Sequence, residues 1–216
     1  MDVFGIRQGY AGLINDDMVP MEMRSVSDIV QRGGTMLRTA RCVEMYTVEG
    51  QKQAVKTLND RGIEGLVVIG GDGSFKGAKC LSEEYGIPTI GIPGTIDNDL
   101  EYTDYTLGFD TAVNTCLDII NKLRDTMTSH ERISVVEVMG RRCGDIALYS
   151  GIASGAEIIV VPEIEYNMDD IVFRINRSRA NGKHSNIIIL AEGVSTAEEV
   201  SKKLQAMTTY SVRGTT

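Results

Sequence analysis

Short β-branched apolar runs recur along this chain with helix-like segments between them, and this alternation limits its fold more than any other feature. The runs cover residues 3–6, 66–69, 89–92, 133–136, 158–161 and 187–190. Continuous apolar runs of this length are typical of parallel strands buried on both faces, and the connections are long enough for crossover helices. The sequence therefore predicts an α/β fold, doubly wound, with mostly parallel sheets that carry helices on both faces.

Helical spacing of apolar residues is clearest over residues 107–124, which we expect to form a helix. Further helices are predicted over residues 49–61, 75–85, 169–180 and 196–207, the last with Ser195 or Thr196 as its N-cap. The chain begins within a strand-like run, and residues 211–216 look like another strand that has just started. We therefore expect the sequence to be cut at both ends.

Composition excludes several classes of protein. A formal charge of -8 argues against a general nucleic-acid binder, which needs clustered Lys and Arg. No stretch approaches the roughly 20 apolar residues of a membrane helix, and no export signal opens the chain. The four Cys and two His residues lack the spacing of a structural zinc site. We expect a cytoplasmic protein with reduced thiols and no membrane partner.

A glycine-rich turn joins the second strand run to a helix. Residues 70–74 read GGDGS and stand at a strand's carboxyl end. Glycines let the backbone approach a phosphate, and the free amides of a helix start favour its negative charge. Asp72 would repel a bare phosphate, but it suits a magnesium ion that bridges phosphates. A plain strand-to-helix turn, in which Asp72 only caps the helix, is the alternative.

A second loop, residues 93–99 with the sequence PGTIDND, is called the acidic loop below. Ligands of open α/β sheets bind outside the carboxyl ends of the strands, so we expect this loop and the glycine-rich turn to face one crevice. A carboxylate there can accept the proton of an attacking hydroxyl. We assign this base role to Asp97 and an orienting role to Asp99. The alternative is a turn whose Asp and Asn side chains bond only the local backbone.

A third loop, residues 139–145, reads MGRRCGD and again places glycines and cations after a strand. Guanidinium groups bind phosphate through a planar fork. Arg132 stands at the other end of that strand, too far from Arg141 for both to grip one phosphate at about 3.3 Å per residue. One of these two arginines is therefore expected to serve a neighbouring subunit. The alternative for the arginines of this loop is an ordinary surface charge, which is the default interpretation for Arg142.

These three loops, together with residues 191–193 (AEG), closely resemble the ATP-dependent 6-phosphofructokinases of bacterial type over almost the whole chain. The first motif alone is shared with lipid and NAD kinases, whereas the second and third together are specific. The resemblance implies phosphoryl transfer from Mg-ATP to the 1-hydroxyl of fructose 6-phosphate, a step of glycolysis, by a homotetramer with active sites at subunit contacts.

The resemblance also implies roles for individual residues. It makes Asp97 the catalytic base, counts Thr95 and Arg141 among the catalytic residues, and makes Asp72 a ligand of Mg²⁺. The implied ATP contacts are Arg41, Cys42, Gly71, Asp72, Gly73 and Ser74. The implied contacts of fructose 6-phosphate are Thr95, Ile96, Asp97, Arg132, Met139, Gly140, Arg141 and Glu192, with Arg132 reaching a neighbouring subunit's substrate.

An effector site for ADP or phosphoenolpyruvate is implied as well. Its matching positions are Arg124, Glu157, Lys183 and His184. Met23 and Arg24 depart from the residues that relatives often carry there, and ordinary surface charges are the alternative.

We expect two similar lobes, a nucleotide- and magnesium-binding lobe over residues 1–106 and a sugar-phosphate-binding lobe over residues 107–216. The family's first strand and nucleotide loop would precede Asp2, and more cationic sugar-phosphate ligands would follow Thr216. Gly73 and Gly94 favour ATP, because pyrophosphate-using relatives usually carry Asp and Lys there. The alternatives are a pyrophosphate-dependent enzyme, another kinase such as an NAD kinase, and a ligand-binding fragment without catalysis.

Overall fold

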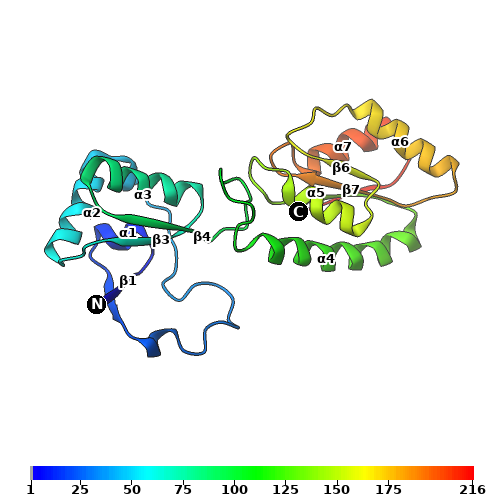
Figure 1. Ribbon diagram of the computed structural model, residues 1–216. Helices are drawn as coiled ribbons and strands as arrows, with labels where there is room; N and C mark the ends of the chain where they lie inside the picture. Colours follow the sequence, from blue (N-terminus) through cyan, green and yellow to red (C-terminus); the bar gives the residue numbers. More distant parts are fainter. Residues whose placement is uncertain (1) are drawn as a thin grey trace. The chain divides into compact units, whose positions relative to one another are not determined.

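The computed structural model describes residues 2–216 (Figure 1). The chain forms two compact units, one that ends at Ile92 and a second, Pro93–Thr216. No helix in residues 2–216 is both long enough and apolar enough to cross a membrane.

The first unit holds two small sheets and three helices. Its elements are β1 (Val3–Ile6), α1 (Tyr10–Ile14), β2 (Met18–Met21), the 3-10 turns η1 (Met23–Val26) and η2 (Glu44–Tyr46), α2 (Val48–Asp60), β3 (Leu66–Gly70), α3 (Asp72–Tyr85) and β4 (Thr89–Pro93). One sheet pairs β1 with β2, and the other pairs β3 with β4. The core contains Leu13, Met45, Ala54, Leu58 and Leu81.

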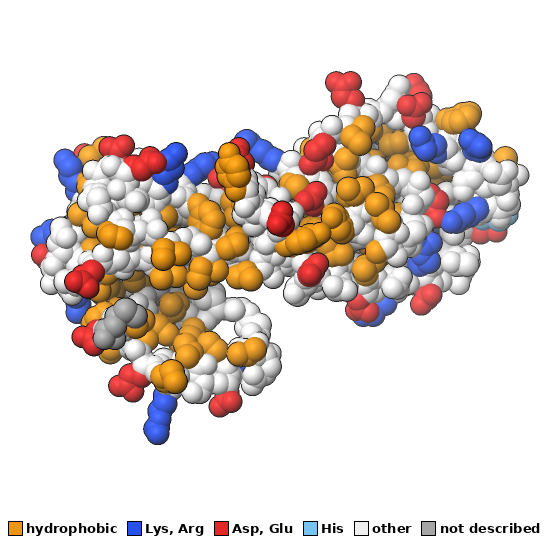
Figure 2. Space-filling view, viewed as in Figure 1, with side chains coloured by type: hydrophobic (Ala, Val, Ile, Leu, Met, Phe, Trp, Pro, Cys, Tyr) orange, Lys and Arg blue, Asp and Glu red, His pale blue; other side chains and the backbone are white. Residues whose placement is uncertain are grey.

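Two expectations for this unit were wrong in detail. Residues 3–6 form a strand, but β1 pairs antiparallel with β2, because the connection between them is too short for a crossover. Burial of the runs 66–69 and 89–92 is only partial, since Val67, Ile69 and Ile90 are 63%, 66% and 67% exposed. Helices cover one face of the β3–β4 pair, and apolar side chains remain at the surface of this unit (Figure 2).

The second unit is a parallel sheet with helices on both faces. Its elements are α4 (Phe109–His130), β5 (Ile133–Val138), α5 (Asp145–Ser154), β6 (Ile158–Val160), α6 (Met168–Ala180), β7 (Asn186–Ala191), α7 (Ala197–Met207) and β8 (Val212–Thr215). The strand order is β6-β7-β5-β8, and every adjacent pair is parallel. One apolar cluster lies between the sheet and α4 and α5, and another between the sheet and α6 and α7 (Figure 1). The predicted fold class is confirmed.

The strongest local signals also located the helices. The helix predicted from residue 107 to residue 124 runs over Phe109–His130, and Thr196 caps α7 by accepting a hydrogen bond from the Glu199 amide at 3.2 Å. The short elements α1, β2 and α5 were not predicted. The apolar residues of α5 are spread around the helix rather than along one stripe, so its sequence lacks the usual helical period.

The boundary between the two compact units falls between Ile92 and Pro93, earlier in the chain than residue 107, where the sequence predicts the division. The intervening segment belongs to the second unit because its ends are tied there. The Leu107 amide donates to the Pro93 carbonyl at 3.0 Å, and the Gly108 amide donates to the Thr95 carbonyl at 2.9 Å. The separate nucleotide and sugar-phosphate roles of residues 1–106 and 107–216 stay predictions.

Candidate active site

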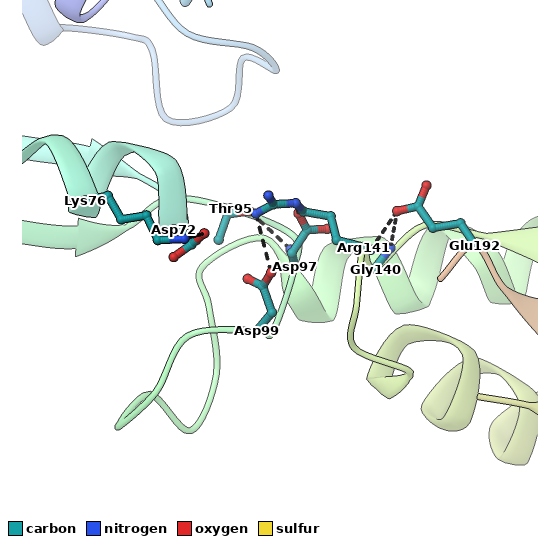
Figure 3. Close-up of polar contacts among 8 residues, drawn as sticks. All are labelled: Asp72, Lys76, Thr95, Asp97, Asp99, Gly140, Arg141 and Glu192. Atoms are coloured by element: carbon teal, nitrogen blue, oxygen red, sulfur yellow. Dashed lines mark hydrogen bonds and ion pairs between the residues drawn. The ribbon is translucent and has the colours of Figure 1, made fainter. Parts of the chain in front are cut away.

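The acidic loop places Asp97 and Asp99 opposite Arg141 (Figure 3). Arg141 Nη1 lies 3.4 Å from Asp99 Oδ2, and Arg141 Nε lies 3.9 Å from Asp97 Oδ2. The two carboxylate side chains are only 15% and 17% exposed. The structure therefore brings together the predicted base, its predicted orienting neighbour and the predicted substrate arginine.

The surroundings of Asp97 disfavour its charge. Burial raises the pKa of Asp97, and the nearby charges of Asp99 and Glu192 raise it further, while Arg141 lowers it. The Oδ1 atoms of Asp97 and Asp99 are buried and have no hydrogen-bond partner among the described residues. Since a buried carboxylate oxygen without a donor is costly, these two atoms are suited to meet a group from a ligand.

The local-turn alternative explains only part of this loop. Thr95 Oγ1 accepts a hydrogen bond from the Asp97 amide at 3.2 Å, and Asn98 Oδ1 accepts one from the Thr106 amide at 3.0 Å. Thr95 and Asn98 thus shape the backbone locally. The carboxylates of Asp97 and Asp99 are directed instead toward Arg141 (Figure 3).

Glu192 fixes the backbone that carries Arg141. Its Oε1 atom accepts hydrogen bonds from the amides of Gly140 at 3.0 Å and Arg141 at 2.6 Å. Arg141 has a φ of 54°, in the left-handed region that non-glycine residues rarely adopt. Val138 and Ala191 are partners in the β5–β7 register, so the two strands deliver the Arg141 turn and Glu192 to the same edge of the sheet.

The glycine-rich turn has the geometry of a helix start with open amides. Gly71 is the N-cap of α3 and provides no side-chain cap, so Asp72 is the first helical residue rather than the cap. The Asp72 carboxylate pairs with Lys76 Nζ at 2.7 Å, and its side chain is 33% exposed. A Cβ added at Gly73 would meet no atom within 4 Å, which leaves open space on that side of the turn.

Asp72 suits a magnesium ion that is coordinated jointly by the protein and by the phosphates of a ligand. Mg²⁺ keeps several water ligands and takes one or two protein carboxylates beside substrate phosphates. No three His, Cys, Asp or Glu side chains gather into a metal cage within residues 2–216. A single partly exposed carboxylate at a helix N-terminus, as in Asp72, is compatible with such a shared ion.

Arg132 lies at the start of β5, at the opposite end of that strand from Arg141, as expected. Together with Arg213 of β8 it lines a cavity of about 290 Å³, whose wall also contains Thr126 and Ser134. Sequence analysis did not identify Arg213 and placed further cationic ligands only beyond Thr216. The register pairs Ser134 with Arg213, and the strand-like run at residues 211–216 was the available signal.

The remaining predicted residues are exposed, packed in the core of their own unit or held in local contacts. Arg41 is exposed, and the pKa of the Cys42 thiol is raised, first by burial. Arg124 donates to the Ser154 carbonyl at 2.6 Å, and Lys183 forms an ion pair with Glu157. Ile96 packs against the core of the second unit, and Met139 is exposed. The Ser74 carbonyl accepts a hydrogen bond from the Tyr10 hydroxyl, and the His184 carbonyl accepts one from Arg179.

Comparison with known proteins gives one consistent result. The family model described as Phosphofructokinase matches residues 1–216. The chain is 60% identical over 215 residues to the ATP-dependent 6-phosphofructokinase of Clostridium botulinum (strain Hall), covering 100% of this chain and 67% of the relative. It is 56% identical to ATP-dependent 6-phosphofructokinase 1 of Clostridium perfringens, with the same coverage.

Among solved structures, phosphofructokinase from Saccharomyces cerevisiae superposes with a TM-score of 0.88 at 33% identity. The match covers 99% of this chain and 33% of the yeast chain, so the sequence spans about a third of that structure's length. The family model, the identity to the clostridial relatives and the shared fold agree. This chain belongs to the phosphofructokinase family.

Proposed function

We propose that this chain carries the catalytic core of an ATP-dependent 6-phosphofructokinase. The reaction transfers the γ-phosphoryl group of ATP to the 1-hydroxyl of fructose 6-phosphate and yields fructose 1,6-bisphosphate and ADP. The observation that carries the proposal is the pair of largely shielded carboxylates, Asp97 and Asp99, opposite Arg141. The clostridial relatives, named ATP-dependent enzymes, favour ATP over pyrophosphate as the donor.

Asp97 is the proposed general base. In its ionised form, the carboxylate accepts the proton of the 1-hydroxyl as that oxygen forms a bond to the γ-phosphorus and the bond to the β-phosphate oxygen breaks. The raised pKa of Asp97 makes its carboxylate a better proton acceptor than an ordinary aspartate. Arg141 balances the charge of the carboxylate pair and is well placed to stabilise the phosphoryl group in transfer.

Charged groups elsewhere in the chain are assigned to the substrates. Asp72 is proposed to hold a Mg²⁺ ion, which would neutralise charge on the ATP phosphates. Gly71, Gly73 and Ser74 at the start of α3 would meet those phosphates through backbone amides. Arg132 and Arg213 line one cavity and are proposed to receive the 6-phosphate of a neighbouring subunit's substrate in a homotetramer.

An effector site is proposed around Arg124, Glu157, Lys183 and His184, with ADP or phosphoenolpyruvate as its ligand. The Lys183–Glu157 ion pair and the Arg124 contacts at the end of α5 lie in the second unit. An anionic effector would compete with Glu157 for Lys183. The cytoplasm is the compartment in which we expect the enzyme to work.

The test is an assay of the 216-residue chain with fructose 6-phosphate and Mg-ATP, with Mg-pyrophosphate in parallel and Asp97→Asn as the matched variant. Fructose 1,6-bisphosphate formed with ATP, and lost in Asp97→Asn by on the order of 1,000-fold, is the expected result. Product with pyrophosphate alone would reassign the donor. Turnover of Asp97→Asn near that of the unmodified chain would refute the assignment of the base, and binding of both ligands without product would indicate a ligand-binding fragment.

A further inference from the structure

Asn98, the residue between the two carboxylates, connects the acidic loop to the start of α5. Its Nδ2 atom donates to Asp145 Oδ2 at 2.8 Å and to the Asp104 carbonyl at 3.2 Å, and its Oδ1 atom accepts from the Thr106 amide at 3.0 Å. The side chain therefore makes three hydrogen bonds, two within the nearby segment that holds Asp104 and Thr106 and one to the start of α5.

The bond to Asp145 joins two loops that are far apart in sequence. Asp145 is the first residue of α5 and ends the third loop, which carries Arg141. That helix start is itself anchored, because the Gly144 amide donates to Glu163 Oε1 at 2.8 Å. One side-chain hydrogen bond thus ties the loop that carries Asp97 and Asp99 to the fixed end of the loop that carries Arg141.

We propose that Asn98 is a positioning residue that holds the Asp97 and Asp99 carboxylates opposite Arg141 through its hydrogen bond to Asp145. This inference rests on the proposed function, in which Asp97 is the base. The Asp97 and Asp99 side chains are directed toward Arg141, while the residue between them bonds in another direction, to Asp145 and Thr106. Fixing the middle residue therefore fixes the orientation of both neighbours.

Only an amide meets the needs of this position. The two acceptors, the Asp145 carboxylate and the Asp104 carbonyl, require two N–H donors, and the Thr106 amide requires an acceptor. An aspartate at this position would lack both donors and face a second carboxylate. The pair of buried Oδ1 atoms on Asp97 and Asp99 without partners is costly to maintain, so the loop needs an independent restraint such as this one.

The first test compares Asn98→Ala, Asp145→Ala and the double variant, with Asn114→Ala as the control. Asn114 is an exposed asparagine in α4 whose amide donates to the Asp110 carbonyl, one turn earlier in the same helix. Asn98→Ala is expected to lower kcat on the order of 100-fold, because a small misplacement of a reacting group has effects of that size. The KM for ATP should stay unchanged, and Asn114→Ala should behave like the unmodified chain.

The double-variant cycle and an independent readout decide between positioning and a general structural role. If the bond is responsible, Asn98→Ala has little further effect in the Asp145→Ala background. In ¹³C NMR titrations of the Asp97 carboxyl, assigned with Asp97→Asn, loosening the loop should expose the carboxylate and lower its pKa toward the ordinary value. This titration needs no turnover and therefore decides the question even in an inactive chain.

The outcomes separate this inference from the proposed function. An unchanged Asp97 titration in Asn98→Ala, or fully additive effects in the cycle, would overturn the positioning role. If Asp97→Asn abolishes turnover while Asn98→Ala does not change it, the proposed function stands and this inference fails. If Asp97→Asn retains turnover, the base assignment fails, and the NMR shift still shows whether Asn98 sets the environment of Asp97.

Discussion

At the residue scale, the central feature is a carboxylate whose neighbours act on it in opposite directions. Burial and the charge of Asp99 raise the pKa of Asp97, and the guanidinium of Arg141 lowers it. A general base must be ionised to work, so turnover should fall as the pH drops through the raised pKa. The pH at which this fall occurs, the acid limb of the pH profile, then reports how the neighbouring charges set the pKa of Asp97.

Substitution of the two neighbours is expected to move the acid limb in opposite directions. Asp99→Asn removes a negative charge that disfavours ionisation, so the limb of kcat/KM should move to lower pH. Arg141→Gln removes the positive charge that favours ionisation, so the limb should move to higher pH, although the maximal rate also falls. The measurement is a pH profile of kcat/KM for each variant, compared by the position of the limb rather than its height.

Two findings would contradict this account of Asp97. A shift in the same direction for both variants would mean that another group is responsible for the limb. An unmoved limb in both would mean that the charges of Asp99 and Arg141 do not reach the titrating group, and the base would have to be sought elsewhere.

At the scale of elements, a carboxylate within the sheet positions a helix. Glu137 lies in β5, and its Oε2 atom accepts a hydrogen bond from the Ala197 amide, the first residue of α7, at 2.7 Å. The Thr196 hydroxyl caps the same helix through the Glu199 amide. Negative charge at a helix N-terminus is favoured by the helix dipole. Since α7 covers one face of the sheet that ends in the Arg141 turn, this contact supports the site indirectly.

Removing these two contacts should destabilise the second unit by different amounts. Thr196→Ala is expected to cost about 1 kcal/mol, as for other N-caps. Glu137→Ala should cost about 1–3 kcal/mol because it leaves a helix amide without its charged acceptor. Glu137→Gln retains an acceptor oxygen and serves as the control, with a smaller loss. Urea unfolding followed by circular dichroism measures the three values, and an equal loss for Gln and Ala would show that the hydrogen bond contributes little.

The sequence predicted those elements whose signals are local. The parallel strands of the second unit and the helix α4 have strong apolar runs or a clear period, and the Thr196 cap follows from a side chain beside its helix. Asn98, Glu137 and Arg213 were missed, because each acts on partners that only the fold brings near. The exposure of Val67 and Ile69 was missed for the same reason, since an apolar run does not reveal what covers it.

At the scale of the whole molecule, the proposed choice of ATP as phosphoryl donor rests partly on Gly73, a position at which the fold leaves open space. Gly73 lies in the first turn of α3, and no atom would contact an added Cβ there. The structure therefore does not require glycine for packing. The φ of Gly73 is not in the left-handed region either, so the backbone conformation does not require glycine at this position. A residue that neither packing nor backbone conformation requires is a candidate for a functional requirement.

Gly73→Asp is expected to fold normally and to use ATP less well. A carboxylate at this position would repel the ATP phosphates and occupy the space beside the helix start, so the KM for ATP should rise on the order of tenfold or more. Gly73→Ala is the control, because it adds a Cβ without charge and should raise stability by about 0.5–1 kcal/mol through helix propensity. Initial rates at varied Mg-ATP, with thermal unfolding of each variant, measure both effects. If Gly73→Asp binds Mg-ATP as tightly as Gly73→Ala does, the open space at Gly73 does not contribute to donor choice, and the preference for ATP must come from residues outside the glycine-rich turn.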